Sequence, residues 1–315
     1  LKNNYGQSEN SSFAWNVENI ATYSNSFGDH NLTVLLGQGA YVENIGGGSS
    51  ATMFGLPITS YQDASFNFDI PQADRSSGTY DMVEHKLTSL FARVNYDFKE
   101  KYLLTGIIRR DGSSRFGANH KFGVFPSFNV GWVVSKEEFW KENDVINTLK
   151  IRGGYGVVGN DAIPNFRYLS LVEGGYNYSF GNTGAITTGY ANLTLDNPDL
   201  RWEETSQANI GFESKFFNNL NLTVDVYNKK TTGILRPINI PGYVGVVSNP
   251  TGNVADMENR GIEVELGYRK QFGDFNFSAN ANFAYLENEV TYVAADANYI
   301  QGDASFQSMG PVKRT

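Results

Sequence analysis

The sequence contains no cysteine, which excludes a disulfide scaffold, a thiolate metal site and a thiol nucleophile. Basic residues are also scarce, since 25 Lys and Arg stand against 33 Asp and Glu and give a formal net charge of -8. That balance argues against a nucleic-acid binder, whose affinity depends on clustered Lys and Arg. Apolar runs are short as well, and none approaches the ~18 residues that a membrane-spanning helix needs.

Aromatic residues and glycine, in contrast, are abundant among the 315 residues, with 22 Phe, 18 Tyr, 4 Trp and 33 Gly. So much aromatic surface argues against disorder, and the composition favours β structure. The sequence starts at Leu1 without a signal-peptide pattern and ends at Thr315 without a closing element. We therefore expect an internal piece of a longer protein.

Residues 275–286 give the clearest secondary-structure signal, because apolar and polar side chains alternate along the segment. Successive side chains of a strand point to opposite faces, so a period of two predicts a strand. One face carries Phe275, Phe277, Ala279, Ala281, Phe283 and Tyr285. With this segment, the pattern predicts ten strands, the others at 13–26, 31–44, 85–98, 102–110, 122–134, 149–158, 209–213, 220–226 and 262–269.

The predicted connections alternate between short and long. Short turns are expected at 27–30, 99–101, 217–219 and 271–274, while 135–147 is longer and predicts a short helix at 136–146 capped by Ser135. Long loops are expected at 45–84, 111–121, 159–203, 235–259 and 291–315. Transmembrane β-barrels have short periplasmic turns and long extracellular loops, so the pattern favours part of an antiparallel transmembrane β-barrel.

The chemistry of the two faces supports a barrel over a soluble sandwich. Polar residues of the alternating segments suit a wet lumen and would be costly in a dry core. Aromatic residues lie near strand ends, where the interfacial girdles of a barrel would be. They are Trp15, Tyr96, Phe98, Tyr102, Trp132, Phe216, Phe217, Tyr268 and Phe283.

Several stretches resemble a known family. They are, in chain order, RRDGSSRFG at 109–117, FPSFNVGW at 125–132, IRGGYGVVGN at 151–160, NPDLRWEET at 197–205, LTVDVYNKKT at 222–231, and GNV at 252–254 followed by MENRGIE at 257–263. In this order they resemble the barrel of SusC/RagA-type TonB-dependent transporters of the Bacteroidetes outer membrane. The resemblance covers most of the chain from about residue 85, and 1–84 fits the same barrel more loosely.

The resemblance implies that residues 1–315 form one partial domain, about ten strands of a 22-stranded barrel in the cell outer membrane. It implies that the N-terminal extension, TonB box, plug domain and C-terminal strands lie outside this sequence. The implied partners are a SusD-like surface lipoprotein, the TonB complex through the N-terminal part, outer-membrane lipid and an oligosaccharide or peptide substrate. No nucleic acid, cofactor or catalysed reaction is implied.

Gly154, Gly156 and Gly159 match the dinucleotide fingerprint G-x-G-x-x-G. That chemistry needs a helix N-terminus after the glycines to hold a pyrophosphate. The segment that follows, 160–164, predicts a loop, so we interpret the glycines as small residues in a closely packed strand.

The basic cluster of Arg109, Arg110 and Arg115 could bind an anion through guanidinium forks. The alternative is an ion-paired strand end beside Asp111. The resemblance favours the alternative, because the stretch recurs in transporters with differing substrates.

His30, His85 and His120 are the histidines of the chain. An omptin-like outer-membrane protease would need acid and histidine pairs at the outer rim of its barrel. We expect His30 in a short turn and interpret each histidine as an exposed surface residue, so catalysis is not expected. No calcium-loop motif is present, although a calcium ion held by distant loop positions stays an open alternative.

The loop at 159–203 contains six aromatic residues that could stack on sugar rings or pack the loop itself. They are Tyr168, Tyr176, Tyr178, Phe180, Tyr190 and Trp202. Tyr176, Tyr178 and Trp202 are the candidate substrate-binding residues, although Trp202 lies in a recurring stretch that favours a scaffold role.

The predicted function is therefore a barrel segment of a TonB-dependent importer of glycans or peptides. The alternative from another class is a secreted or surface β-rich adhesin or carbohydrate-binding module. The two differ in what covers the apolar face, because acyl chains cover it in a barrel and a protein core covers it in an adhesin.

Overall fold

The computed structural model describes residues 2–294, apart from 142–143, 180, 182–183 and 185. The long strands are β1 (Asn4–Phe27), β2 (His30–Phe54), β4 (His85–Phe98), β5 (Tyr102–Ser113), β6 (Phe122–Val133), β7 (Ile146–Asn160), β12 (Glu203–Phe216), β13 (Leu220–Pro237), β14 (Thr251–Phe272) and β15 (Phe275–Val293). Shorter strands are β3 (Arg75–Asp81), β8 (Leu171–Gly174), β9 (Tyr178–Ser179), β10 (Ile186–Thr187) and β11 (Tyr190–Thr194). Short 3₁₀ turns lie at Tyr61–Asp63, Gln72–Asp74, Val134–Lys136 and Gly242–Val244.

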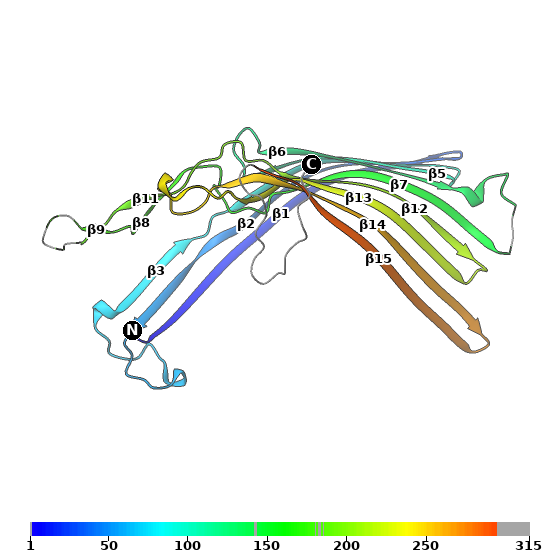
Figure 1. Cartoon of the computed structure of the whole chain (residues 1–315). Coiled ribbons are helices and arrows are strands. Elements are labelled where there is room, and N and C mark those ends of the chain that lie inside the picture. The colour runs from blue at the N-terminus through cyan, green and yellow to red at the C-terminus, as the bar shows by residue number, and fades with distance from the viewer. Residues whose placement is uncertain (1, 142–143, 180, 182–183, 185, 295–315) are drawn as a thin grey trace. The chain divides into compact units, whose positions relative to one another are not determined.

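The ten long strands follow one another in a single antiparallel sheet (Figure 1), and each of the ten predicted strands is present. Several are longer than predicted, because β1 begins at Asn4, and parts of the expected loops at 45–84 and 235–259 belong to β2, β3 and β14. The order is β1-β2-β4-β5-β6-β7-β12-β13-β14-β15, and β3 pairs with β2 beside this path. Each long strand therefore pairs with its neighbour in the chain. Within the described residues, no helix is long and apolar enough to cross a membrane.

The short turns have the backbone geometry that tight hairpins require. Gly28 and Gly273 lie in the left-handed region, with φ of 62° and 61°. Lys99 and Glu100 share this region without being glycine, and the Glu100 amide donates to the Asp97 carboxylate at 2.7 Å. Turns whose central residues have positive φ match the right-handed twist of the strands that they join.

The predicted helix at 136–146 is wrong. In the described part of this stretch, a 3₁₀ turn at Val134–Lys136 is followed by irregular backbone, and β7 begins at Ile146. Tertiary contacts explain the difference, because the Glu137 side chain binds groups at the start of β5 and the end of β6. The Tyr102 hydroxyl and the Trp132 indole N–H donate to its carboxylate at 2.6 and 2.9 Å, and Lys101 lies 3.3 Å away.

The chain divides into two compact units. One comprises the residues up to Glu18 together with Gly39–Thr88, and its core joins Met53, Leu56 and Ile70. The other comprises Asn19–Gln38 and the chain from Ser89 onward, and it contains β5 and all later strands. The expectation that residues 1–315 form one barrel domain stays a prediction.

The bound Glu137 carboxylate predicts acid sensitivity of this turn. Hydrogen bonds from Tyr102, then from Trp132 and Lys101, lower the pKa of Glu137 below its ordinary value. A lowered pKa gives stabilisation that is present above the unfolded-state pKa of about 4.3 and is lost as the pH falls through the folded-state pKa. We expect Glu137→Gln to lower the unfolding temperature at pH 7 by a few degrees. The unfolding temperature of this variant should also decrease less as the pH is lowered below 4.

Thermal unfolding between pH 3 and pH 7 checks this, with the exposed neighbour Glu138 changed to Gln as the control. Equal effects of the two substitutions at every pH would contradict the role of Glu137.

Candidate functional site

The sheet from β5 to β15 has one face that is apolar over a broad band. In strand register, one row joins Tyr102, Trp132, Ile151, Phe212, Val224, Val264 and Phe283, and the next joins Leu104, Val130, Gly153, Ile210, Val226, Ile262 and Tyr285. Most of these side chains are exposed in the structure, and Ile210 and Phe283 are each 62% exposed. A continuous apolar surface of this extent marks a contact with lipid or with another protein.

The opposite face of the same strands is polar. One row joins Leu103, Gly131, Arg152, Gly211, Asp225, Glu263 and Ala284. On β15 this face carries Ser278, Asn280 and Asn282, which alternate with Phe277, Ala279 and Ala281 of the apolar face. The distribution matches the predicted division into a lipid-facing side and a wet lumen.

An ion network centred on Arg152 lies on the polar face. The guanidinium of Arg152 is 2.6 Å from Asp225 and 2.8 Å from Glu213, and Lys150 is 3.4 Å from Glu213. Gly211 lies opposite both Arg152 and Asp225, and a Cβ at this glycine would be 2.3 Å from the Asp225 carboxylate. The glycine therefore leaves room for an ion pair that spans three strands.

The glycines of the G-x-G-x-x-G match serve packing, as expected. They lie within β7, and the described residues 161–170 that follow are loop and turn rather than helix. A Cβ at Gly154 would lie 2.1 Å from the Asn129 amide oxygen, and one at Gly159 would lie 2.1 Å from the Phe125 ring. Side chains of neighbouring strands occupy the space where other residues would have a Cβ.

A small apolar core joins the long connections where they leave the strands. Phe116 and Leu200 are fully buried, and Trp202 is 8% exposed. The Trp202 ring centroid lies 5.1 Å from that of Phe116 and 5.4 Å from that of Phe125, and its indole N–H donates to the Lys121 carbonyl at 3.3 Å. We call Phe116, Phe125, Leu200 and Trp202 the loop-base core.

Backbone-directed hydrogen bonds connect the same loops. The Asn253 side chain accepts from the Arg201 amide at 3.1 Å and donates to the Arg201 carbonyl at 2.9 Å. Asn197 donates to the Thr251 carbonyl at 2.9 Å, and the Ser248 amide donates to the Leu193 carbonyl at 2.8 Å. The described residues 193–201 of the first loop are therefore linked directly to residues 248–253.

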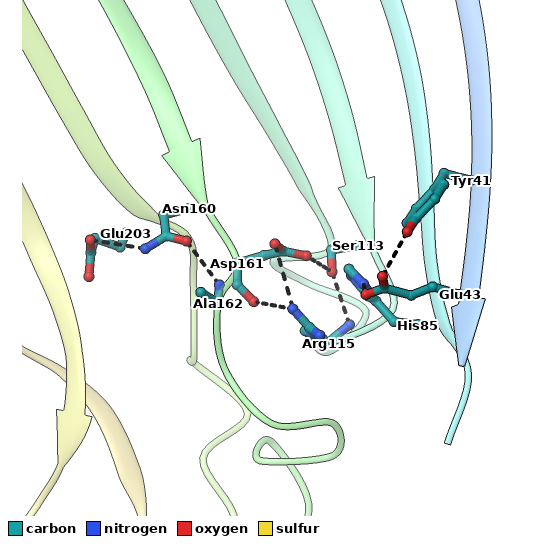
Figure 2. A network of polar contacts seen from close by, with 9 residues as sticks. All are labelled: Tyr41, Glu43, His85, Ser113, Arg115, Asn160, Asp161, Ala162 and Glu203. Atoms are coloured by element: carbon teal, nitrogen blue, oxygen red, sulfur yellow. Dashed lines mark hydrogen bonds and ion pairs between the residues drawn. The ribbon is translucent and has the colours of Figure 1, made fainter. Parts of the chain in front are cut away.

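Asp161 links the start of the loop at 161–202 to the end of β5 and the residues that follow it (Figure 2). The Ser113 hydroxyl donates to its carboxylate at 2.6 Å, and Arg115 donates to its carbonyl at 3.2 Å. Arg109 forms a two-point contact with Asp111 at 3.1 and 3.2 Å, while Arg110 lies 3.9 Å from the centre of the Phe122 ring. Arg109, Arg110 and Arg115 thus all contact groups of the protein itself, which agrees with the structural role predicted for them.

The expectation of an exposed His85 is wrong, since this residue is 3% exposed. Its Nδ1 lies 2.8 Å from the Glu43 carboxylate, which also accepts from the Tyr41 hydroxyl at 2.7 Å (Figure 2). The sequence could not show this burial, because the partner lies on another strand. Glu43 and His85 do form an acid–histidine pair, but His85 is buried. The histidine of a protease site has to be accessible to its substrate.

The other two histidines lie in different surroundings. His30 follows the first turn, and its ring contacts Tyr96 at 2.7 Å and lies 4.6 Å from the Phe98 ring. His120 lies 3.9 Å from the Asp199 carboxylate. Within the described residues, no group of His, Asp and Glu could hold a metal ion.

The three candidate substrate-binding residues are not equivalent. Tyr176 and Tyr178 are 38% and 44% exposed, and Tyr178 belongs to the small β9–β10 hairpin. Trp202 belongs to the loop-base core, and its burial favours the scaffold role. Phe180 lies outside the described residues. Asn253 and Asp161, which hold the loop bases, were not among the candidates, although Asn253 stands in the GNV stretch at 252–254 that contributes to the family resemblance.

The family model described as TonB dependent receptor-like, beta-barrel matches residues 1–307. The chain belongs to this family. TonB-dependent receptor P39 of Formosa agariphila is 36% identical over 303 residues, which are 93% of the chain and 28% of that receptor. TonB-dependent receptor SusC of Bacteroides thetaiotaomicron is 34% identical over 225 residues, which are 69% of the chain and 22% of that receptor.

The fold agrees with these relatives. A structure of the RagAB peptide importer in its closed-closed state superimposes with a TM-score of 0.81 at 26% identity, over 95% of this chain and 32% of the importer chain. The chain thus spans less than a third of each of these three relatives. These findings confirm the SusC/RagA resemblance, and the relatives are receptors and importers, not enzymes.

The loop-base core predicts that Trp202 holds the TonB-dependent receptor's long loop in place. Trp202→Ala removes the aromatic contacts and leaves a cavity, which costs about 3–5 kcal/mol for a buried Trp. We expect faster amide exchange and faster protease cleavage in 161–202, with the strands unchanged.

Hydrogen exchange followed by mass spectrometry checks this, and Tyr190→Ala is the control because Tyr190 is 75% exposed. Exchange in 161–202 that is unchanged in Trp202→Ala would show that the core does not order the loop.

Proposed function

We propose that this chain is a multi-pass part of the barrel of an outer-membrane importer that takes up oligosaccharides or peptides. The observation that carries the proposal is the division of the β5–β15 sheet into an apolar and a polar face within a TonB-dependent receptor barrel. The apolar face contacts lipid, and the polar face lines the path of the substrate.

Exposure of the apolar face supports insertion in a membrane. Phe128, Val130 and Ile108 are each at least half exposed, although they lie on inner strands of the sheet. A soluble adhesin would bury such a face in its own core. The surface therefore favours the barrel over the adhesin.

The partners follow from the SusC/RagA resemblance. A SusD-like surface lipoprotein would cover the long-loop side and trap the substrate there. TonB would act on the N-terminal part of the complete receptor and open a path through the plug. The loops ordered by the loop-base core would present Tyr176 and Tyr178 to a sugar ring or peptide side chain, because both are partly exposed.

The importer proposal predicts that insertion depends on one face of β15. Ala281 lies on the apolar face opposite Leu266, and Asn280 lies on the polar face opposite Gly267. Arginine on a lipid-facing strand costs about 2–4 kcal/mol near the bilayer midplane. We expect Ala281→Arg to lower the amount of receptor in the outer-membrane fraction severalfold, while Asn280→Arg leaves it near normal.

Membrane fractionation and heat-dependent gel mobility measure both variants. A similar loss for Asn280→Arg and Ala281→Arg would mean that the two faces do not differ in lipid contact.

Energy coupling is tested on the complete receptor by deleting the TonB box that the family resemblance places before the barrel. We expect uptake of the oligosaccharide or peptide to stop while binding at the cell surface persists. Uptake at the normal rate without the TonB box would overturn the importer mechanism.

A further inference from the structure

The apolar face ends, on the short-turn side of β14 and β15, in aromatic side chains that surround one lysine. Lys270 lies opposite Phe277, and the next pair on the same face is Phe272 with Phe275. Tyr268 precedes Lys270 on this face of β14. Aromatic side chains of a barrel gather at the membrane–water interface. If the apolar face lies in lipid, Lys270 therefore lies at the level of the head groups on the short-turn side.

The rings around Lys270 leave this residue exposed. Its Nζ lies 5.1 Å from the centre of the Phe272 ring, and the rings of Tyr268 and Phe277 are 6.0 Å apart. Phe272, Phe275 and Phe277 are 53%, 64% and 43% exposed. A lysine in such a position rests its apolar stem on the rings and keeps its ammonium group in the polar layer.

The Lys270 ammonium has no counter-ion within the described residues, where its contact is the Phe272 ring. Lysines at another short turn differ in this respect. Lys99 lies 3.5 Å from the Asp29 carboxylate, and Lys101 lies 3.3 Å from the Glu137 carboxylate. The charge of Lys270 is therefore available to a group from outside the described residues.

The hairpin around Lys270 carries more positive than negative charge. Residues 266–282 contain Arg269 and Lys270 against Asp274. Arg269 lies on the polar face, opposite Ser278, so Lys270 is the cation of the apolar face in this segment. A cation at head-group level attracts an anionic head group. A zwitterionic head group brings a positive charge of its own and gains less from the contact.

We propose that the short-turn end of the β14–β15 hairpin binds an anionic phospholipid of the leaflet on that side. The phosphate of the head group lies against the Lys270 ammonium. One acyl chain lies over the short side chains of Ala279 and Ala281, which follow Phe277 on the apolar face. This inference rests on the proposed function, because it requires the apolar face to lie in a membrane.

The test is native mass spectrometry of the complete receptor, purified in a maltoside detergent and mixed with phosphatidylglycerol or phosphatidylcholine of identical acyl chains. We expect the unmodified receptor to retain phosphatidylglycerol more strongly. Lys270→Gln should weaken the retention of phosphatidylglycerol about fivefold, the contribution of one cation near a charged lipid surface, and should hardly change that of phosphatidylcholine. Lys270→Arg keeps the charge and should keep the preference.

Arg269→Gln is the matched control, because Arg269 is exposed and lies next to Lys270 on the opposite face of β14. It should retain both lipids like the unmodified receptor. Unchanged retention of phosphatidylglycerol by Lys270→Gln would overturn the inference, as would an equal loss in Arg269→Gln or in Lys270→Arg. Equal retention of the two lipids by the unmodified receptor would overturn it as well.

Membrane fractionation separates this inference from the proposed function. A receptor that reaches the outer membrane but does not select phosphatidylglycerol through Lys270 contradicts the lipid site alone. A receptor that is absent from the outer membrane contradicts the proposed function, and the lipid site with it.

Discussion

The register of backbone hydrogen bonds between neighbouring strands is the constraint on which the rest of this structure depends. Because side chains alternate along a strand, a slip of one residue would move every side chain to the other face. From β5 to β15 the register keeps Ile210, Val226 and Ile262 on one face and Gly211, Asp225 and Glu263 on the other. Both the apolar surface and the polar wall result from this single alignment.

The loops depend on the sheet in a second way, because strand ends supply the groups that order them. Phe125 of β6 and Trp202 before β12 meet in the loop-base core, and Gly159 of β7 leaves the space that the Phe125 ring needs. Asn253 of β14 holds Arg201 by two hydrogen bonds. A rigid base of this kind lets the distal part of a loop vary with the substrate while its attachment stays the same.

Period-two alternation and turn chemistry were sufficient to predict the ten long strands and most of their short connections, because both signals are local. What failed depends on distant partners. The helix expected at 136–146 is replaced by an irregular turn because Tyr102 and Trp132 bind Glu137. His85 is buried against Glu43, 42 residues earlier. The Asn253 contact with Arg201 spans 52 residues and was equally invisible in the sequence.

Spin labelling along β15 tests the two-faced sheet most directly, and residues 1–315 contain no cysteine that would compete with the introduced one. Labels at each position from 276 to 283 in the complete receptor, reconstituted in lipid, would be probed with oxygen, which concentrates in the bilayer, and with a water-soluble nickel chelate. The account predicts a period of two, with oxygen contact highest at Phe277, Ala279, Ala281 and Phe283 and chelate contact highest at the residues between them. Equal accessibility of both sets to both reagents would contradict it.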